Sequence, residues 1–349
     1  MDRTKREAYY DNLKFWLITI VVIGHFVEFY MNENAVCRWL WYYIYIFHMP
    51  LFIFVTALFL KSTINRKPFR IDKILSYLIV CYFMKVTILL LKQYWFGVEQ
   101  EFSIFDGEGP WWFLFVIAAY IPITYLLRDV KKTYVFFGSI IAALIIGFDD
   151  TVFTYMTLSR LVVGYPFFYA GYCLDRQAIK SVCKGPGKLK RISAVLFLLA
   201  SALTLALNID IYPKIAGLST MRNPYAYLGI DEAYGAVARL LFYVLVFLMM
   251  LAIMIIIPEK RAFYTNWGSR TLQIYVVHGY IIRILAFYGF GYWLANWSGR
   301  YWPLLLILSA VLCTVLLSGK WMEKPFKKVM SLNFDFIYNQ GEAEDGKTK

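Results

Sequence analysis

The chain has 349 residues, of which 60% are hydrophobic and 19% aromatic, and its mean hydropathy is +0.55. Soluble domains contain about 45–50% apolar residues, so this composition excludes a soluble domain and indicates a membrane protein. The formal charge of +13 comes from lysines and arginines grouped between apolar runs. We therefore expect no binding to nucleic acid.

Apolar runs of about 20 residues, the length that crosses a bilayer, recur along the whole chain. They predict an all-α polytopic membrane protein with about ten transmembrane helices. The fifth run, YVFFGSIIAALIIGF, is the weakest because it is short and contains glycine. The expected spans are 12–31, 39–60, 74–96, 111–127, 134–148, 156–174, 192–209, 236–257, 272–294 and 301–319.

Most lysines and arginines fall in alternate connections, which should face the cytoplasm by the positive-inside rule. The other connections, such as EQEFSIFDGEGP and FDDT, are acidic or neutral. This alternation predicts cytoplasmic N- and C-termini. It also divides the chain into a transmembrane domain over 1–331 and a polar, disordered cytoplasmic tail over 332–349.

The chain has only three histidines, and all of them fall within expected spans. With a helix rise of ~1.5 Å per residue, His25 lies roughly 20 Å from the cytoplasmic end of its helix, His48 near mid-membrane and His278 roughly 10 Å from the cytoplasmic end. One interpretation is three core histidines, each bonded to a neighbouring helix. The three together favour a shared polar cavity, because titratable residues within spans commonly mark functional sites.

Lys14 precedes His25 by eleven residues, which places both on one helix face to within about 20°. We expect a cation at the cytoplasmic entrance and an imidazole about 16 Å deeper, both facing the same space. Alternatively, Lys14 is an ordinary flanking residue that snorkels to the interface. Asp11 lies about 21 Å below His25, so we expect it to hold Lys14 or another cation.

Several segments resemble motifs of the membrane acyltransferase-3 family, and most closely its fucose 4-O-acetylase-like branch. YDNLKFWLITIVVIGH resembles the family's opening helix, with lysine here in place of the usual arginine and a histidine eleven residues later. FHMPLFIFVTA at 47–57 resembles FHMPLFFFISG, and SRTLQIYVVH at 269–278 resembles NTLxIYLLH. RLVVGYPFFYAGYCL at 160–174, WFL at 112–114 and EKPF at 323–326 extend the similarity from residue 6 to about 327.

The resemblance implies acyl transfer from a coenzyme A thioester to a hydroxyl, commonly on a sugar of a surface glycan. It implies acetyl-CoA as the donor and co-substrate, with a succinyl donor as the alternative. Basic clusters bind phosphates through charge-assisted hydrogen bonds, although topology alone also places basic residues in this connection. The residues assigned to the donor are Lys14, Asp11, Lys61, Arg66, Lys67, Arg70 and Lys73.

His25 is the expected general base, because imidazole gains and loses a proton near neutral pH. A covalent route, in which His25 itself carries the acyl group, stays open. We expect His48 and His278 to line or orient the site, and we place Lys14 with these histidines in the catalytic set.

The acceptor side is assigned to Arg160, Trp112 and Lys85. Arg160 matches a family position, and charges deep in a span usually face the bundle interior. Trp112 fits a sugar face or, equally, an interfacial aromatic belt. Arg239 and Arg283 can reach the outer interface by snorkelling and are left out of the site.

The sequence therefore predicts a multi-pass plasma-membrane O-acyltransferase, specifically an O-acetyltransferase, that acts on a sugar or surface glycan. A secondary transporter built on the same intramembrane charges is the alternative, although we find no internal repeat of the kind transporters show. The expected partners are acyl-CoA, a glycan acceptor and the lipid bilayer. Five widely spaced cysteines indicate neither a disulfide framework nor a zinc site, so no metal is expected.

Overall fold

The computed structural model describes residues 7–99, 102–105, 107, 109–153 and 155–338. Within these residues the chain forms α-helices and no β-strand, which confirms the all-α class. The helices are α1 (Ala8–Glu28), α2 (Ala35–Ile64), α3 (Asp72–Leu90), α4 (Trp112–Leu126), α5 (Lys132–Ile145), α6 (Leu158–Cys173), α7 (Arg176–Lys184), α8 (Lys188–Leu207), α9 (Tyr212–Ser219), α10 (Gly235–Ile256), α11 (Thr271–Phe287), α12 (Phe290–Ser298), α13 (Trp302–Leu317) and α14 (Glu323–Met330).

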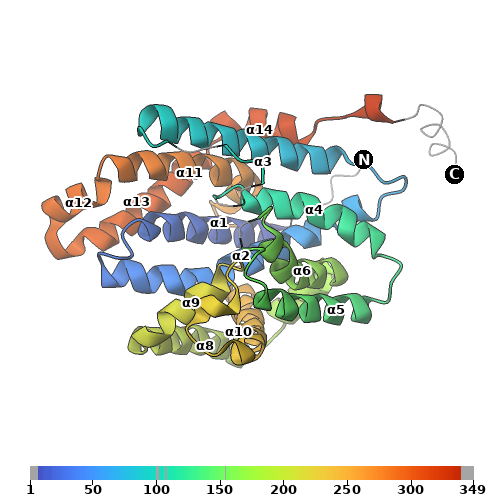
Figure 1. The fold of residues 1–349 in the computed structure, drawn as a ribbon, viewed down its shortest axis with the longest axis horizontal. Coiled ribbons are helices and arrows are strands. Elements are labelled where there is room, and N and C mark those ends of the chain that lie inside the picture. Colours follow the sequence, from blue (N-terminus) through green and yellow to red (C-terminus); the bar gives the residue numbers. More distant parts are fainter. Residues whose placement is uncertain (1–6, 100–101, 106, 108, 154, 339–349) are drawn as a thin grey trace.

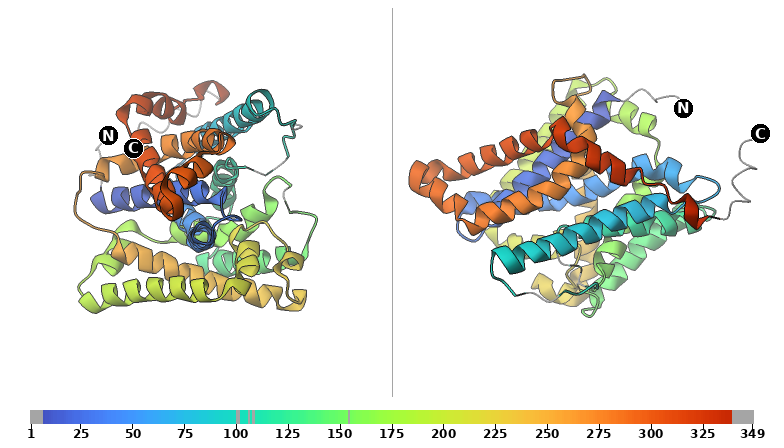
Figure 2. Two further views of the ribbon diagram at one scale, coloured as in Figure 1. Left: turned by 90° about the vertical axis from the view of Figure 1, so that its left-hand side faces the viewer. Right: turned by 90° about the horizontal axis from the view of Figure 1, so that it is seen from above.

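Several helices, including α2, α3, α11 and α13, run roughly along the long axis of the molecule, with α1 and α2 in the middle, whereas α8 and α10 run across it (Figures 1 and 2). Helices α3, α11, α13 and α14 lie on one side of this central pair, and α8, α9 and α10 lie on the other (Figures 1 and 2). The central helices make the most extensive contacts: α1 packs against α2, α11 and α13, and α2 packs against α6. Polar residues in the middle of α1 and α2, such as Thr19 and His48, are therefore buried among other helices.

The two ends of the bundle are fixed by contacts of α1. At the end where α1 begins, the ring of Tyr10 packs against Phe59 near the end of α2, with 5.7 Å between centroids. At the other end, the hydroxyl of Tyr30 accepts a hydrogen bond from the amide of Gly291 at 2.8 Å. We call these the N-terminal end and the opposite end.

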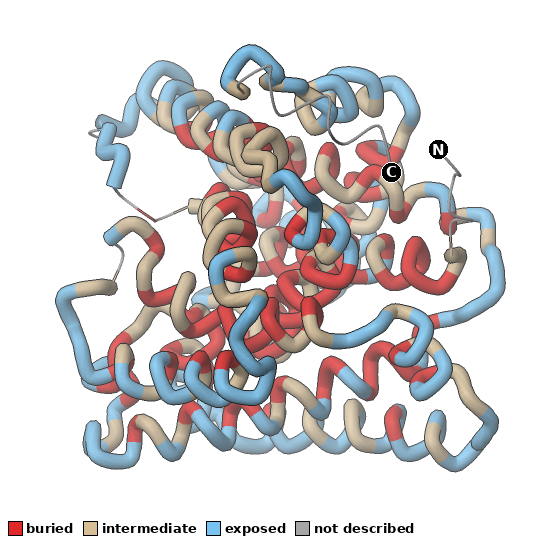
Figure 3. The backbone as a smooth tube through the Cα atoms, turned by 90° about the vertical axis from the view of Figure 1, so that its right-hand side faces the viewer, coloured by how far each residue is buried: buried red, intermediate tan, exposed pale blue. Residues whose placement is uncertain are grey.

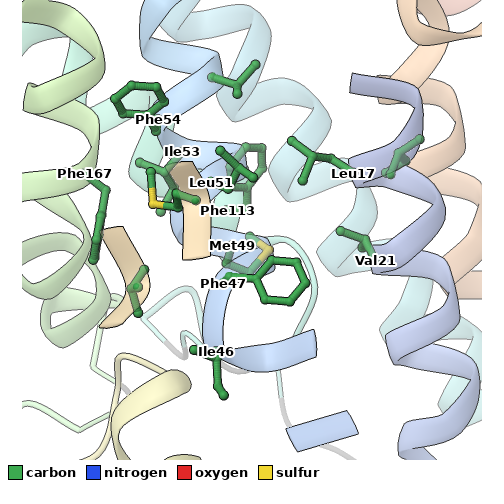
Figure 4. Packing of buried hydrophobic residues seen from close by; sticks show 14 of the residues in the cluster. Leu17, Val21, Ile46, Phe47, Met49, Leu51, Ile53, Phe54, Phe113 and Phe167 are labelled. Carbon is green, nitrogen blue, oxygen red and sulfur yellow. The ribbon is translucent and has the colours of Figure 1, made fainter. Parts of the chain in front are cut away.

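The core forms around α1 and α2 because both helices are apolar over most of their circumference, as enclosed helices are. Figure 4 shows Leu17 and Val21 of α1 and the rings of Phe113 and Phe167 from α4 and α6. It also shows six buried residues of α2: Ile46, Phe47, Met49, Leu51, Ile53 and Phe54. The most apolar stretch of α1 is 72% buried, whereas that of α8 is 11% buried. Figure 3 shows the same division, with buried backbone inside and exposed backbone on the outer helices. The exposed leucines of α8 suit contact with lipid tails.

Within the part of the chain that the structure describes, six helical stretches are long and apolar enough to cross a membrane: Ala8–Glu28, Ala35–Ile64, Asp72–Trp95, Lys188–Leu207, Glu232–Ile256 and Phe290–Leu317. Apolar helices also occupy the other expected spans, but they are shorter; Trp112–Leu126 and Lys132–Phe148 are two of them. The structure therefore supports a membrane protein with six candidate spans. The count of ten and the cytoplasmic placement of both termini stay predictions.

The expected ninth span, 272–294, is not one helix. Helix α11 ends at Phe287, and α12 begins at Phe290 after Gly289, whose φ of +67° favours glycine. Helix α12 then continues through a short 3₁₀ turn into α13. The apolar run hides this break because the residues on both sides of the glycine are apolar.

Buried polar contacts fix α1 at the N-terminal end. The Asn12 side-chain amide donates to the carbonyls of Pro258 and Lys260 at 2.8 and 2.9 Å, and its oxygen accepts from the Thr265 hydroxyl at 2.7 Å. The backbone of Asp11 comes so close to Gly268 that an added Cβ would lie 1.9 Å from the Asp11 carbonyl oxygen. Only glycine fits at that approach.

The segment after α14 folds back onto the α2–α3 connection. Arg70 bonds to Asp72 and Asp335, the amide of Phe334 donates to Asp72 at 2.9 Å, and the Tyr338 hydroxyl accepts from the amide of Ile71 at 2.7 Å. We call residues 331–338 the C-terminal clasp. The predicted tail is thus packed over 332–338, while 339–349 lies outside the described residues.

Candidate active site

A polar cavity of about 480 Å³ lies toward the opposite end of the bundle. Its walls come from the last turn of α1, the first half of α2, the starts of α4 and α6, the end of α9 and the middle of α11. Most of these elements are separated by more than a hundred residues in sequence. The lining includes His25, His48, His278, Glu28, Tyr45, Trp41, Trp112, Arg160, Arg222 and Arg283.

The structure brings the three predicted histidines to this one cavity. The ring centroids of His25 and His278 are 5.4 Å apart, and Tyr45 stands between His25 and His48, at 6.2 and 4.6 Å from their centroids. His278 is fully buried and His48 is 3% exposed. His25 keeps 27% of its side chain exposed, so it is the most accessible imidazole of the three.

Backbone carbonyls fix the tautomers of the two buried histidines. Nδ1 of His48 lies 2.9 Å from the Ile44 carbonyl oxygen, and Nδ1 of His278 lies 2.8 Å from that of Ile274. A carbonyl only accepts hydrogen bonds, so Nδ1 carries the hydrogen and Nε2 keeps a lone pair in the neutral ring. Nε2 of His278 is buried without a hydrogen-bond partner among the described residues.

Glu28, one helical turn after His25, is a site residue that the sequence reasoning missed. Its Oε2 lies 2.8 Å from His25 Nδ1 and accepts from the Tyr45 hydroxyl at 3.0 Å. The i,i+3 spacing of a histidine and a glutamate on a helix was the available signal. His25 is therefore held at Nδ1, and its Nε2 is the nitrogen left for chemistry.

Arg160 and Trp112, both predicted for the acceptor side, form one wall of the cavity. The Arg160 guanidinium lies 4.8 Å from the centroid of a Trp112 ring and donates to the carbonyls of Gly107 and Thr220 at 2.9 and 3.2 Å. These contacts tie two connections to the start of α6. The cationic group is thereby held rigidly at the cavity surface.

The snorkelling interpretation of two arginines is wrong. Arg283 lines the cavity and donates to the Gly279 carbonyl at 2.7 Å, so its side chain turns into the bundle. Arg239 is 2% exposed and donates to the carbonyls of Ala143 and Asn223. Hydrogen bonds to backbone carbonyls hold both guanidiniums inside the bundle, although Nε of Arg239 is buried without a hydrogen-bond partner among the described residues.

Two other predicted residues lie away from this cavity. Lys14 is bound to Asp11, with 2.8 Å between Nζ and Oδ1, and sits 4.5 Å from the Phe59 ring centroid at the N-terminal end. It shares a helix face with His25 but not a cavity, because different neighbours pack on that face at each depth. Lys85 donates to the Ile104 carbonyl at 3.1 Å beside a small separate pocket that it lines with Cys81.

The predicted basic cluster lines a second pocket, of about 450 Å³, at the N-terminal end. Arg66, Arg70 and Lys73 face it, and Met330 and Leu332 close it from the C-terminal side. Lys61 and Lys67 are not among its lining residues. We call this the basic pocket, and it is distinct from the histidine cavity.

Within the basic pocket, Arg70 is already engaged by carboxylates. Its guanidinium lies 2.6 Å from Asp72 and 2.5 Å from Asp335. Hydrogen bonds from Arg70 and Asn333 hold the pKa of the Asp335 carboxyl below its usual range. By contrast, Arg66 makes no ion pair with any residue that the structure describes.

Comparison with known proteins identifies the class. The family model of the acyltransferase domain, acyltransferase-3, matches residues 7–319, and the chain therefore belongs to the acyltransferase-3 family. It is 27% identical over 181 residues to the nodulation protein NolL of Sinorhizobium fredii, covering 48% of each chain, so the match spans about half of that relative. It is 37% identical over 67 residues to NolL of Mesorhizobium japonicum, covering 18% of each chain. No solved structure matches.

Proposed function

We propose that the chain is a membrane O-acyltransferase of the plasma membrane that moves an acyl group from a cytoplasmic acyl-CoA to a hydroxyl of a sugar or surface glycan. The observation that carries this proposal is His25, held at Nδ1 and partly exposed in a polar cavity of about 480 Å³. Membership of the acyltransferase-3 family supports the same chemistry. The family match lends no support to the transporter alternative.

The transfer step follows from the nitrogen that remains available. Nε2 of His25 takes the proton of the acceptor hydroxyl while its oxygen attacks the thioester carbonyl. The tetrahedral intermediate then breaks its carbon–sulfur bond, and the leaving thiolate takes the proton from His25. Arg160 lies where it can bind the acceptor or stabilise the oxyanion. His48 and His278 orient the reacting groups.

The donor is proposed to be acetyl-CoA, bound from the N-terminal end of the bundle, which in this proposal faces the cytoplasm. Arg66 and Lys73 line a pocket large enough for a phosphate-bearing group, and cations of this kind bind phosphate through charge-assisted hydrogen bonds. Lys14 with Asp11, and Lys61 with Lys67, surround the same end as supporting charges. The acceptor enters from the opposite end of the bundle, toward which the histidine cavity lies.

The test compares His25→Ala and His25→Gln with the unmodified chain in cells whose surface glycans are analysed by mass spectrometry. Both variants should lose the added acetyl groups, because an amide hydrogen-bonds but takes no proton at neutral pH. His48→Ala and His278→Ala should lose less. Membrane insertion and acetyl-CoA binding, measured on purified protein in nanodiscs, should survive in all four variants. Acetylation near the normal level in His25→Gln would remove His25 as the base.

A further inference from the structure

Glu28 stands in a position that helix stability does not explain. It is the last residue of α1, and a carboxylate at a helix C-terminus opposes the helix dipole. Its side chain is 41% exposed and lines the cavity instead of the outer surface. The carboxylate has two donors from different helices, His25 of α1 and Tyr45 of α2.

Resting on the function proposed above, we infer that Glu28 is a positioning residue for the base. A carboxylate only accepts hydrogen bonds, so it requires the hydrogen of His25 on Nδ1 and leaves the Nε2 lone pair toward the acceptor. Without this partner, the ring can adopt the other tautomer, in which Nε2 carries a hydrogen and cannot take a proton. The same carboxylate stabilises the imidazolium formed during the transfer step.

Other charged and titratable side chains line the cavity around this carboxylate. The imidazoles of His48 on α2 and His278 on α11 face the same space, with Arg283 on α11, Arg160 on α6 and Arg222 after α9. Among the described residues that line the cavity, Glu28 is the one carboxylate.

The tautomer can be measured without knowing the acceptor, because the chain has three histidines. Protein labelled with ¹⁵N-histidine in nanodiscs gives six ring nitrogen signals, and those missing from His25→Gln identify His25. In the unmodified chain, Nδ1 of His25 should show the shift of a protonated nitrogen and Nε2 that of a lone pair. In Glu28→Gln, the two His25 nitrogens should move toward a mixture, while those of His48 and His278 stay unchanged.

A matched control removes the same charge nearby. Glu33 is exposed, contacts the Tyr292 hydroxyl and does not line the cavity, so Glu33→Gln should leave the His25 signals unchanged. Glu28→Asp keeps a carboxylate at this position and should keep most of the His25 signal pattern of the unmodified chain.

Activity provides the second readout. Glycan acetylation in Glu28→Gln cells should fall at least tenfold, with acetyl-CoA affinity unchanged in nanodiscs. An unchanged His25 tautomer and unchanged acetylation in Glu28→Gln would overturn the inference, even if His25→Gln is inactive. An active His25→Gln would instead remove the proposed base, so the two failures are distinguishable.

Discussion

The histidine cavity and the basic pocket are both rich in charge, but they are assembled in opposite ways. The cavity collects single residues from helices far apart in sequence, such as His25 on α1 and His278 on α11. The basic pocket takes neighbouring residues of one segment, 61–73. Two of its cations are already bound: Arg70 to Asp335 of the C-terminal clasp, and Lys73 to the carbonyl of Met330 at the end of α14. Some cations that are clustered in sequence therefore form ion pairs and hydrogen bonds that hold the fold together. The charged residues that are scattered in sequence come together in the folded chain and line the histidine cavity.

This difference predicts unequal effects of removing one cation from each region. The largest effect is expected for Arg160→Ala, which removes two hydrogen bonds to connection carbonyls and the contact with Trp112. Hydrogen bonds of charged groups are each worth about 1.5–3 kcal/mol, so glycan acetylation should fall by about two orders of magnitude. Arg160→Lys should not restore it, because lysine lacks the planar fork.

The control for that variant is Arg300→Ala, since Arg300 is exposed and lies outside the cavity lining. Acetylation should be unchanged there, with insertion of both variants checked by size-exclusion chromatography. An Arg160→Ala chain that acetylates at half the normal rate would show that Arg160 contributes only packing to the cavity wall, and neither acceptor binding nor oxyanion stabilisation.

An intermediate effect is expected inside the basic pocket. Arg66→Ala should weaken acetyl-CoA binding about tenfold, the low end for a charged hydrogen bond, as measured by calorimetry in nanodiscs. Arg70→Ala should weaken binding less and should instead release the clasp, so that a protease cuts within 331–338. Lys328→Ala, which removes an exposed cation of α14 outside the pocket lining, is the control. Equal losses of affinity with no new cleavage would contradict the distinction drawn between Arg66 and Arg70.

The smallest effect concerns acid. Hydrogen bonds from Arg70, and then from Asn333, lower the pKa of the Asp335 carboxyl. The ionised carboxylate therefore stabilises the folded clasp above the ordinary carboxyl pKa. This stabilisation is lost as the pH falls through the lowered pKa. Cleavage within 331–338 should therefore increase a few-fold between pH 7 and pH 3. In Asp335→Asn the cleavage rate should already be high at pH 7 and should change less with acid. A clasp equally resistant at both pH values would mean that apolar packing holds it.

The helical fold could be predicted from apolar run lengths, which identified every long helix of the structure. The break at Gly289 could not, because a glycine between apolar residues is compatible with a continuous helix until its φ is known. The short helices α7 and α14 were also missed, since they are amphipathic and lie at the bundle surface. The length of an apolar run predicts that a segment is buried in lipid or protein. It does not predict where the helix within that segment breaks or turns.

The site was predictable where one residue type is rare. Three histidines in spans were enough to indicate a cavity, and Arg160 and Trp112 followed from the family resemblance. Glu28 was not predicted because His25 was paired with Lys14, eleven residues earlier on the same helix face, and not with the residue one turn later. Lys14 and His25 share a face of α1, but helix periodicity alone does not predict which other helices pack against that face along its length. In the structure, different neighbours surround the two residues, so only His25 lines the cavity.

The C-terminal clasp has a consequence for the order of synthesis. A chain is made from its N-terminus at about 5–20 residues per second, so Arg66, Arg70 and Lys73 leave the ribosome long before Met330 and Leu332. The basic pocket lacks one wall during that interval. A nascent or prematurely terminated chain can insert its helices yet cannot complete this pocket, so the donor proposed above would bind there only once synthesis has passed Leu332.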